Sequence, residues 1–156
     1  MIATLYLTSA MGAEPVLLAD PTVPLEQAWT HQRFRHATDY ETMRLDGITA
    51  IRAVGRRSAS GLYRGVDYQV LEHPWLEWTW RVDQIQRSAD IRLKEREDFA
   101  AAIFLIFGRP DMFDQDAPTL AYVWTSEQLR EGAVVDSPHH PGFVRSIVVR
   151  SGDDHR

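Results

Sequence analysis

The stretch from Glu72 to Asp83, EHPWLEWTWRVD, places an apolar side chain at every second position. This is the period of a β-strand, because successive side chains of a strand point to opposite faces. The apolar face holds Leu76, Trp78, Trp80 and Val82, and the polar face holds Glu77, Thr79, Arg81 and Asp83. We therefore expect a half-buried strand with Trp78 and Trp80 in the core. Trp75 is in phase with the polar face, so it is the indole we expect to be exposed.

Short strands separated by turn signals are expected along the rest of the chain. RRSASG, residues 56–61, is expected to be a turn or loop because of its Ser and Gly content. A charged loop or helical turn should extend to about Glu97. Strands are expected at 47–55, 62–70, 98–107, 119–126 and 143–152. Several short strands with little helix predict an all-β fold of the antiparallel β-sandwich type.

The composition is that of one globular domain without a strongly charged surface. The chain has 156 residues, is 44% hydrophobic and contains no cysteine. Its net charge of -5 is spread along the sequence, which argues against binding to nucleic acid. Three prolines, at 15, 21 and 24, interrupt regular structure early in the chain. We expect an extended lead-in at 14–28 and a single domain at 29–156.

Residues 1–13, MIATLYLTSAMGA, are apolar and end in small residues, the form of a signal peptide without its positively charged start. We interpret them as a signal peptide remnant, which predicts a periplasmic or secreted protein. Two alternatives remain open: the true start lies upstream, or the stretch is a native first strand. The run is too short to span a membrane, and no other stretch reaches the roughly 20 apolar residues that a helix needs.

Five segments resemble a bacterial family of exported proteins, domain of unknown function 3047, in their order and spacing. They are SASGLYR, PWLEWTWRVD, EDFAAAIFLIF, LAYVWTS and RSIVVRSG, and the likeness extends from about Trp29 to Gly152. The resemblance implies export and a sandwich similar to jelly-roll or galactose-binding-like domains. It implies no activity, cofactor or catalytic residue.

Two departures from the family pattern bear on what the resemblance implies. The family has an arginine shortly after the DFAA position, where this chain has the apolar AAIF, which removes support for a polar site there. The family pattern also continues past VVRSG with further strands. We therefore expect a domain that lacks its C-terminal strands and exposes a sheet edge, to which a protein partner could add a strand.

Aromatic and charged residues on the predicted strands are the candidates for a binding site. Aromatic side chains can stack on sugar rings, and carboxylates with an arginine can surround a sugar or a calcium ion. The alternative for Tyr122 and Trp124 is core packing, because they share a strand face with Leu120. The alternative for the charged residues is ion pairing on a solvated surface. The ligand-binding candidates are Trp75, Arg81, Asp83, Asp98, Tyr122 and Trp124.

Other chemical motifs are weak. Ser58 and Ser60 lack the Gly-x-Ser-x-Gly spacing of a nucleophile elbow, and the sequence assigns no histidine to them. The adjacent His139 and His140 are expected in a solvated loop. The sequence favours an exported, non-catalytic binding domain for a carbohydrate or cell-envelope polysaccharide, with no cofactor unless calcium is bound.

Two alternatives belong to other functional classes. One is a polysaccharide hydrolase or lyase with Asp83, Glu97 or Asp98 as acid or base. The other is a structural or assembly protein of the envelope that pairs through the exposed sheet edge.

Overall fold

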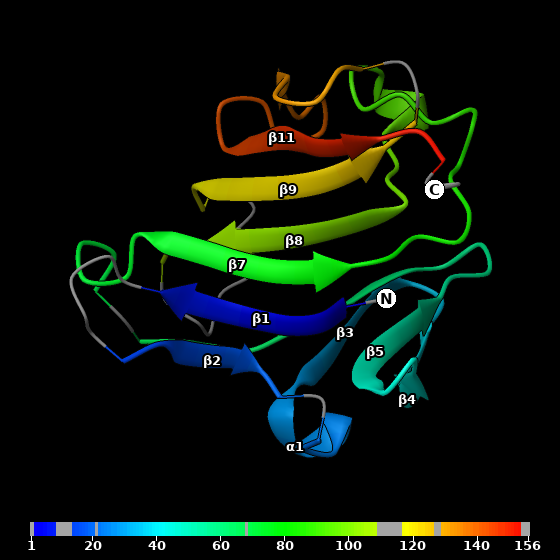
Figure 1. Ribbon diagram of the computed structural model, residues 1–156. Helices are drawn as coiled ribbons and strands as arrows, with labels where there is room; N and C mark the ends of the chain where they lie inside the picture. Colours follow the sequence, from blue (N-terminus) through cyan, green and yellow to red (C-terminus); the bar gives the residue numbers. More distant parts are fainter. Residues whose placement is uncertain are drawn as a thin grey trace. The chain divides into compact units, whose positions relative to one another are not determined.

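The computed structural model describes residues 2–8, 14–20, 22–67, 69–108, 117–126 and 129–153. The chain forms two compact units, Met1–Arg81 (unit 1) and Val82–Arg156 (unit 2). The described residues are nearly all β, with several antiparallel strand pairs, which confirms the all-β, sandwich-like class (Figure 1). Among them, no helix is long and apolar enough to cross a membrane.

Unit 1 contains a five-stranded sheet, a two-stranded sheet and one short helix. The five-stranded sheet has the order β2-β1-β5-β4, and β7 also pairs with β1. The two-stranded sheet pairs β3 with β6. The elements of unit 1 are β1 (Ile2–Thr8), β2 (Val16–Ala19), α1 (Leu25–Ala28), β3 (Thr30–Arg35), β4 (Asp39–Leu45), β5 (Ile48–Val54), β6 (Ala59–Tyr63) and β7 (Trp75–Trp80).

The first strand is central to its sheet. β1 pairs with β2, β5 and β7, and Leu5 and Leu7 are buried (Figure 1). Ile2–Thr8 therefore has the form of the native first strand that the sequence left open. Met1 and residues 9–13 of the predicted signal peptide remnant lie outside the described residues, and removal of the stretch on export stays a prediction. The expected lead-in at 14–28 contains β2 and α1.

A tight hairpin joins β4 and β5. Leu45 pairs with Ile48, so the turn consists of two residues, Asp46 and Gly47, with φ values of 51° and 83°. Two-residue hairpin turns of the I′ type require positive φ at both positions, and Asp-Gly is a preferred sequence for them. The turn fixes which residues of β4 and β5 face each other.

The strand after this hairpin begins earlier than the sequence predicted. Ala59, Ser60 and Gly61 belong to β6, whereas we expected them in a turn, and the strand ends at Tyr63. β6 begins at this point because it pairs with β3, where Arg33 faces Ser60 and Thr30 faces Tyr63. Local Ser and Gly preferences are thus overridden by cross-strand pairing. The correction places the Ser60 hydroxyl on a sheet.

The tryptophan strand shows the predicted alternation. In β7, Trp75 is exposed, whereas Trp78 and Trp80 are half-buried and contact each other edge-on at 5.5 Å between ring centroids. Trp75 is 58% exposed, which confirms the phase assigned to it. The two other indoles are less buried than a core position implies.

Unit 2 contains a four-stranded sheet of order β10-β11-β9-β8. Its β9–β11 pair is parallel, unlike the antiparallel pairs β10–β11 and β8–β9 of the same sheet (Figure 1). A parallel pair needs a long connection between its strands, and the segment from 126 to 143, which includes β10, supplies it. The elements of unit 2 are the 3₁₀ turn η1 (Lys94–Arg96), β8 (Ala101–Ile106), β9 (Thr119–Thr125), β10 (Val134–Asp136) and β11 (Val144–Ser151).

The core of unit 2 lies on the small-residue face of β9. Ala121 and Val123 are fully buried and form a cluster with Ile91 and Val148. We expected the face with Leu120, Tyr122 and Trp124 to line the core, but Leu120 and Tyr122 are only half-buried. Small side chains let Ile91 approach the sheet closely, which explains why this face is the more densely packed one.

Candidate functional site: a polar pocket on the β4–β5 hairpin

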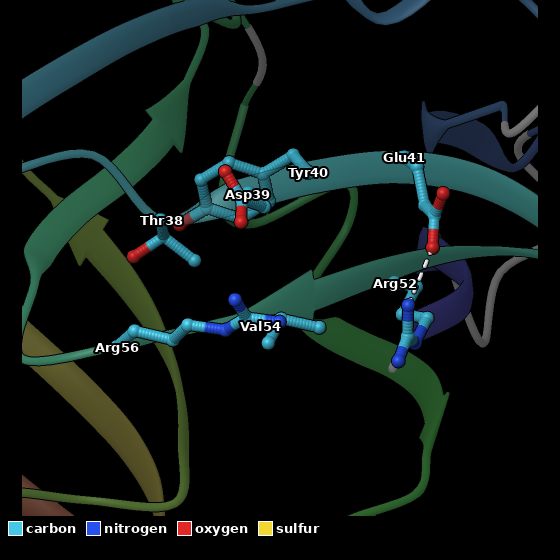
Figure 2. A pocket seen from close by; sticks show the side chains of 7 residues that line it. All are labelled: Thr38, Asp39, Tyr40, Glu41, Arg52, Val54 and Arg56. Atoms are coloured by element: carbon cyan, nitrogen blue, oxygen red, sulfur yellow. Dashed lines mark hydrogen bonds and ion pairs between the residues drawn. The ribbon is translucent and has the colours of Figure 1, made fainter.

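An open pocket of about 380 Å³ lies on the β4–β5 hairpin of unit 1 (Figure 2). It combines two carboxylates and two guanidinium groups with hydroxyl and apolar side chains. Its lining residues are Thr38, Asp39, Tyr40, Glu41, Arg52, Val54 and Arg56.

The hairpin register gathers the charged residues on one face. Asp39 faces Val54 and Glu41 faces Arg52 across the two strands. Positions separated by two residues share a face of a strand, so all four of these side chains point to the same side. Arg56 follows Val54 by two residues and extends the same row (Figure 2).

One ion pair is formed within the pocket. Arg52 Nη1 donates to Glu41 Oε1 at 2.6 Å, and both side chains are about half exposed. Such an exposed pair adds little stability, but it holds the two side chains in one orientation. In the described part of the chain, the structure shows no hydrogen bond or ion pair for the side chains of Asp39 and Arg56, so both are available to a ligand.

A hydroxyl network adjoins the pocket. Two lining residues, Thr38 and Tyr40, take part in it: the Thr38 N–H donates to Ser60 Oγ at 2.9 Å, and the Tyr40 hydroxyl donates to the Ser60 carbonyl at 3.0 Å. Thr38 Oγ1 also lies 3.0 Å from Ser58 Oγ. Burial raises the pKa of Tyr40, opposed by its hydrogen bonds with Ser60 and Thr38, so the phenol remains a donor at neutral pH.

His31 completes this network. Its Nε2 lies 2.9 Å from Ser60 Oγ, and its ring contacts Tyr40 edge-on at 5.2 Å between centroids. His31 and Ser60 are diagonal neighbours across β3 and β6, because Arg33 faces Ser60 and His31 faces Leu62. Diagonal positions on one face of a sheet are within reach of long and aromatic side chains.

Of the residues predicted from the sequence, Trp75 lies in unit 1 but not at the pocket. Trp75 faces Thr8 at one end of β1, whereas Ile51, next to Arg52, faces Ile2 at the other end. The six residue steps from Ile2 to Thr8 span about 20 Å of strand. Trp75 and the pocket are therefore separate features of the same sheet.

The predicted charged residues are divided between the two units. Arg81 ends unit 1, and Asp83 belongs to unit 2, where it does not line the second depression of about 250 Å³. Asp98 does line it, together with Glu97, and accepts a bond from the Phe99 N–H at 2.8 Å. The other residues of this depression are Gln86, Ser88, Ala89, Glu95 and Arg96. A hydrolytic role for these carboxylates stays a prediction.

The structure offers no preformed metal cluster in the described ranges. No three His, Asp or Glu side chains there converge in a way that could hold a metal ion. Glu97 has 9% of its side chain exposed and lies 3.7 Å from His139 Nε2, and His139 also lies 2.9 Å from the Lys94 carbonyl. Calcium binding stays a prediction.

One aromatic candidate on β9, Trp124, is packed inside unit 2, the alternative that the sequence analysis included. Trp124 is 2% exposed, and its Nε1 donates to the Gly152 carbonyl at 2.7 Å. The Arg150 guanidinium lies over its ring at 5.9 Å. This indole therefore has no open face for a sugar, and Tyr122 beside it is half-buried.

Sequence reasoning missed the charged row on the hairpin, although a signal for it exists. We predicted β5 but not β4, and single Asp, Glu and Arg residues carry no motif. The Asp46-Gly47 pair is itself a hairpin signal. Counting outward from that turn places Glu41 opposite Arg52 and Asp39 opposite Val54, as observed.

Comparison with known proteins places the chain in a family. Neither the curated proteins nor the solved structures include a match to it. A family model described as Protein of unknown function (DUF3047) matches residues 27–156. The match includes every residue of the hairpin pocket and of the adjoining network, and it covers most of the sequence. The chain therefore belongs to the DUF3047 family.

Proposed function

We propose that the chain is an exported binding domain for a carbohydrate, and that the β4–β5 pocket holds the sugar. The observation that carries this proposal is the row of charged side chains on one face of the hairpin, two of which have no protein partner in the described residues. Carboxylates accept hydrogen bonds from sugar hydroxyls, and guanidinium groups donate two at a time to neighbouring oxygens.

The shape of the pocket favours a polymer over a small enclosed ligand. Sites for small molecules bury most of the ligand surface, whereas this pocket is open along the hairpin. Glu41 and Arg52 already hold each other in place, so they lose little side-chain freedom when a ligand binds. Val54 supplies an apolar surface for the C–H groups of a sugar ring.

Thermal unfolding of the full chain in the presence of glycans tests the proposal. A polysaccharide that binds only the native state stabilises it by about 2.7 kcal/mol at a hundred times the dissociation constant. We expect Asp39→Asn and Arg56→Ala to abolish this shift. Arg44→Ala is the matched control, since Arg44 is an exposed arginine of β4 on the opposite face of the hairpin.

Two results would contradict the proposal. A broad panel of neutral and acidic polysaccharides that leaves the melting temperature unchanged would argue against carbohydrate binding. A shift that persists in both pocket variants would place the sugar elsewhere, and Trp75→Ala would then test the exposed indole of β7.

The export part of the proposal is supported by the apolar start of the chain and by the resemblance to exported proteins. Cell fractionation of the natural host, followed by N-terminal sequencing of the protein, tests it. Recovery in the periplasm or medium is expected, and recovery in the cytoplasmic fraction alone would contradict export.

A further inference from the structure

The His31–Ser60 pair has the arrangement of a base and a nucleophile. Ser60 Oγ lies 2.9 Å from His31 Nε2 and 2.9 Å from the Thr38 backbone nitrogen. The Thr38 N–H can only donate, so it occupies an acceptor position of the hydroxyl and leaves the single Ser60 proton for another partner. His31 Nε2 is an acceptor within reach of that proton when the imidazole is neutral.

The surroundings hold this pair in place. The Tyr40 hydroxyl donates to the Ser60 carbonyl, and the Tyr40 ring packs edge-on against His31. Both residues of the pair are half-buried, which limits competition from water without closing the site. Thr38 and Tyr40 also line the β4–β5 pocket. The Tyr40 side chain lies on the face of β4 opposite to Asp39 and Glu41, so the pair sits behind the charged row of the hairpin. A nucleophile with a base at hydrogen-bond distance is the central part of the geometric signature of covalent catalysis, and here the Tyr40 ring packed against His31 is what holds the base.

We infer that Ser60 is a nucleophile activated by His31 and that it cleaves carboxylic esters. Ser60 Oγ bonds to the acyl carbon and its proton passes to His31 Nε2, which delivers it to the oxygen of the departing alcohol as the old C–O bond breaks. Water then attacks the acyl carbon and gives a proton to His31. The Ser60 ester bond breaks, the carboxylic acid leaves, and the proton returns to Ser60.

The substrate class follows from the position of the pair. The alcohol of an ester departs more easily than the amine of an amide, because an alkoxide is a far weaker base than an amide anion and needs less help from a proton donor. An ester is therefore the bond that a serine and a histidine alone are best suited to cleave. The ester would be an O-acyl group on the ligand of the adjacent pocket, and this part rests on the proposed function. The reactivity of Ser60 itself does not depend on a sugar, so it can be measured separately.

An alkyl fluorophosphonate, which phosphorylates activated serines, tests the inference on the full chain. Mass spectrometry after digestion should locate the adduct on Ser60, and Ser60→Ala should remove it. A general base contributes at least about 100-fold to such reactions, so His31→Gln, which keeps a polar side chain but cannot take up the proton, should slow labelling by at least that factor. Thr42→Ala removes an exposed hydroxyl of β4 outside the pocket lining and should leave labelling of Ser60 at the wild-type rate.

The melting temperature of each variant should also be measured, because loss of the Thr38 bond to Ser60 would lower the stability of the β3–β6 sheet. His31→Gln that melts like the parent and labels slowly supports a chemical role for His31. Absence of any adduct on Ser60 in the folded parent would overturn the inference, as would equal labelling of Ser58 and Ser60 or unchanged labelling in a folded His31→Gln variant. Glycan binding without labelling would leave the proposed function standing and refute only the ester chemistry.

Discussion

Several polar side chains of unit 2 already use their bonding capacity within the fold, whereas two charged side chains of the hairpin pocket in unit 1 do not. In unit 2, Ser126 Oγ donates to the Ala89 carbonyl at 2.7 Å, and Ser151 Oγ donates to the Ser126 carbonyl at 3.0 Å. Asp90 accepts bonds from Nε and Nη2 of Arg92 at 2.8 and 2.7 Å. These groups are occupied by the fold itself. In unit 1, by contrast, the hairpin pocket presents Asp39 and Arg56 without a protein partner in the described residues.

This difference shows why residue type alone is a poor guide to a binding site. Trp124 and Asp90 have the chemistry of ligand-binding residues, yet the fold uses them for packing and for closing a loop. Ordinary exposed charges on the β4–β5 hairpin form a pocket because the register aligns them. A buried polar group must find a partner on folding, whereas an exposed one can keep its bonding capacity for a ligand.

The sharpest test of the two-unit comparison is removal of β1. A chain that starts at Glu14 lacks the strand that pairs with β2, β5 and β7, so unit 1 should lose its sheet while unit 2 keeps its own. Hydrogen exchange followed by mass spectrometry should show amide protection lost in peptides from β5 and β7 and kept in those from β9 and β11. Protection retained throughout unit 1 would show that β1 is dispensable.

A point variant checks that this effect comes from β1 packing. Leu7 is 2% exposed, and Leu7→Ala should cost about 2–5 kcal/mol of unfolding free energy, as buried leucines do. β1 and β2 precede residue 27, where the family match begins. A small cost at Leu7 would mean that the matched residues fold without this strand.

The next largest effect is expected at the tryptophans of the two units. Trp124→Ala in unit 2 removes a buried indole and its bond to Gly152, and should cost about 3–5 kcal/mol. Trp75→Ala in unit 1 removes an exposed indole and should change stability by less than about 1 kcal/mol. Urea denaturation of the two variants measures both values. Similar costs would contradict the distinction between a packing tryptophan and a surface tryptophan.

Local periodicity was sufficient to predict β5, β7, β8, β9, β11 and the exposure of Trp75, but it missed β3 and β4. The alternation in β7 has the period of a strand, and the apolar runs of β8, β9 and β11 lie within the predicted ranges. The parallel pairing of β9 with β11 could not be predicted, because pairing partners far apart in the sequence leave no periodic signal. For the same reason the predicted start of β6 was wrong, because pairing with β3 determines where that strand begins.

The candidate sites depended more heavily on long-range pairing than the strands did. His31 and Ser60 are 29 residues apart, and only the β3–β6 register brings them together. The row of charged residues on the hairpin could have been predicted, since Asp46-Gly47 defines the turn and therefore the register. On β9, the alternation was predicted correctly, but the choice of the more buried face depended on Ile91, which covers the small residues from a loop.

The smallest effect concerns a single carboxylate and its dependence on pH. Hydrogen bonds from the Arg92 side chain, opposed by burial, lower the pKa of Asp90 from 3.8 to about 2. A carboxyl group whose pKa is lower in the folded state stabilises the fold fully above its unfolded pKa, and this contribution disappears as the pH falls through the folded pKa. Asp90 should therefore stabilise unit 2 above about pH 4 and lose this effect on acidification toward pH 2.

Asp90→Asn isolates that contribution, because asparagine accepts hydrogen bonds but does not ionise. The difference in unfolding free energy between parent and variant should be constant from pH 5 to pH 7 and shrink below about pH 4, near the ordinary pKa of 3.8. Asp39→Asn is the matched control in unit 1, since it makes the same substitution at an exposed carboxylate that has no partner in the described residues. A parent-minus-variant difference at Asp90 that does not change between pH 5 and pH 2 would mean that the bonds to Arg92 do not stabilise the ionised carboxylate. The carboxylate of Asp90 would then contribute no more to the fold than the exposed carboxylate of Asp39 on the hairpin. The contrast in how the two units use their polar side chains would not hold for this pair.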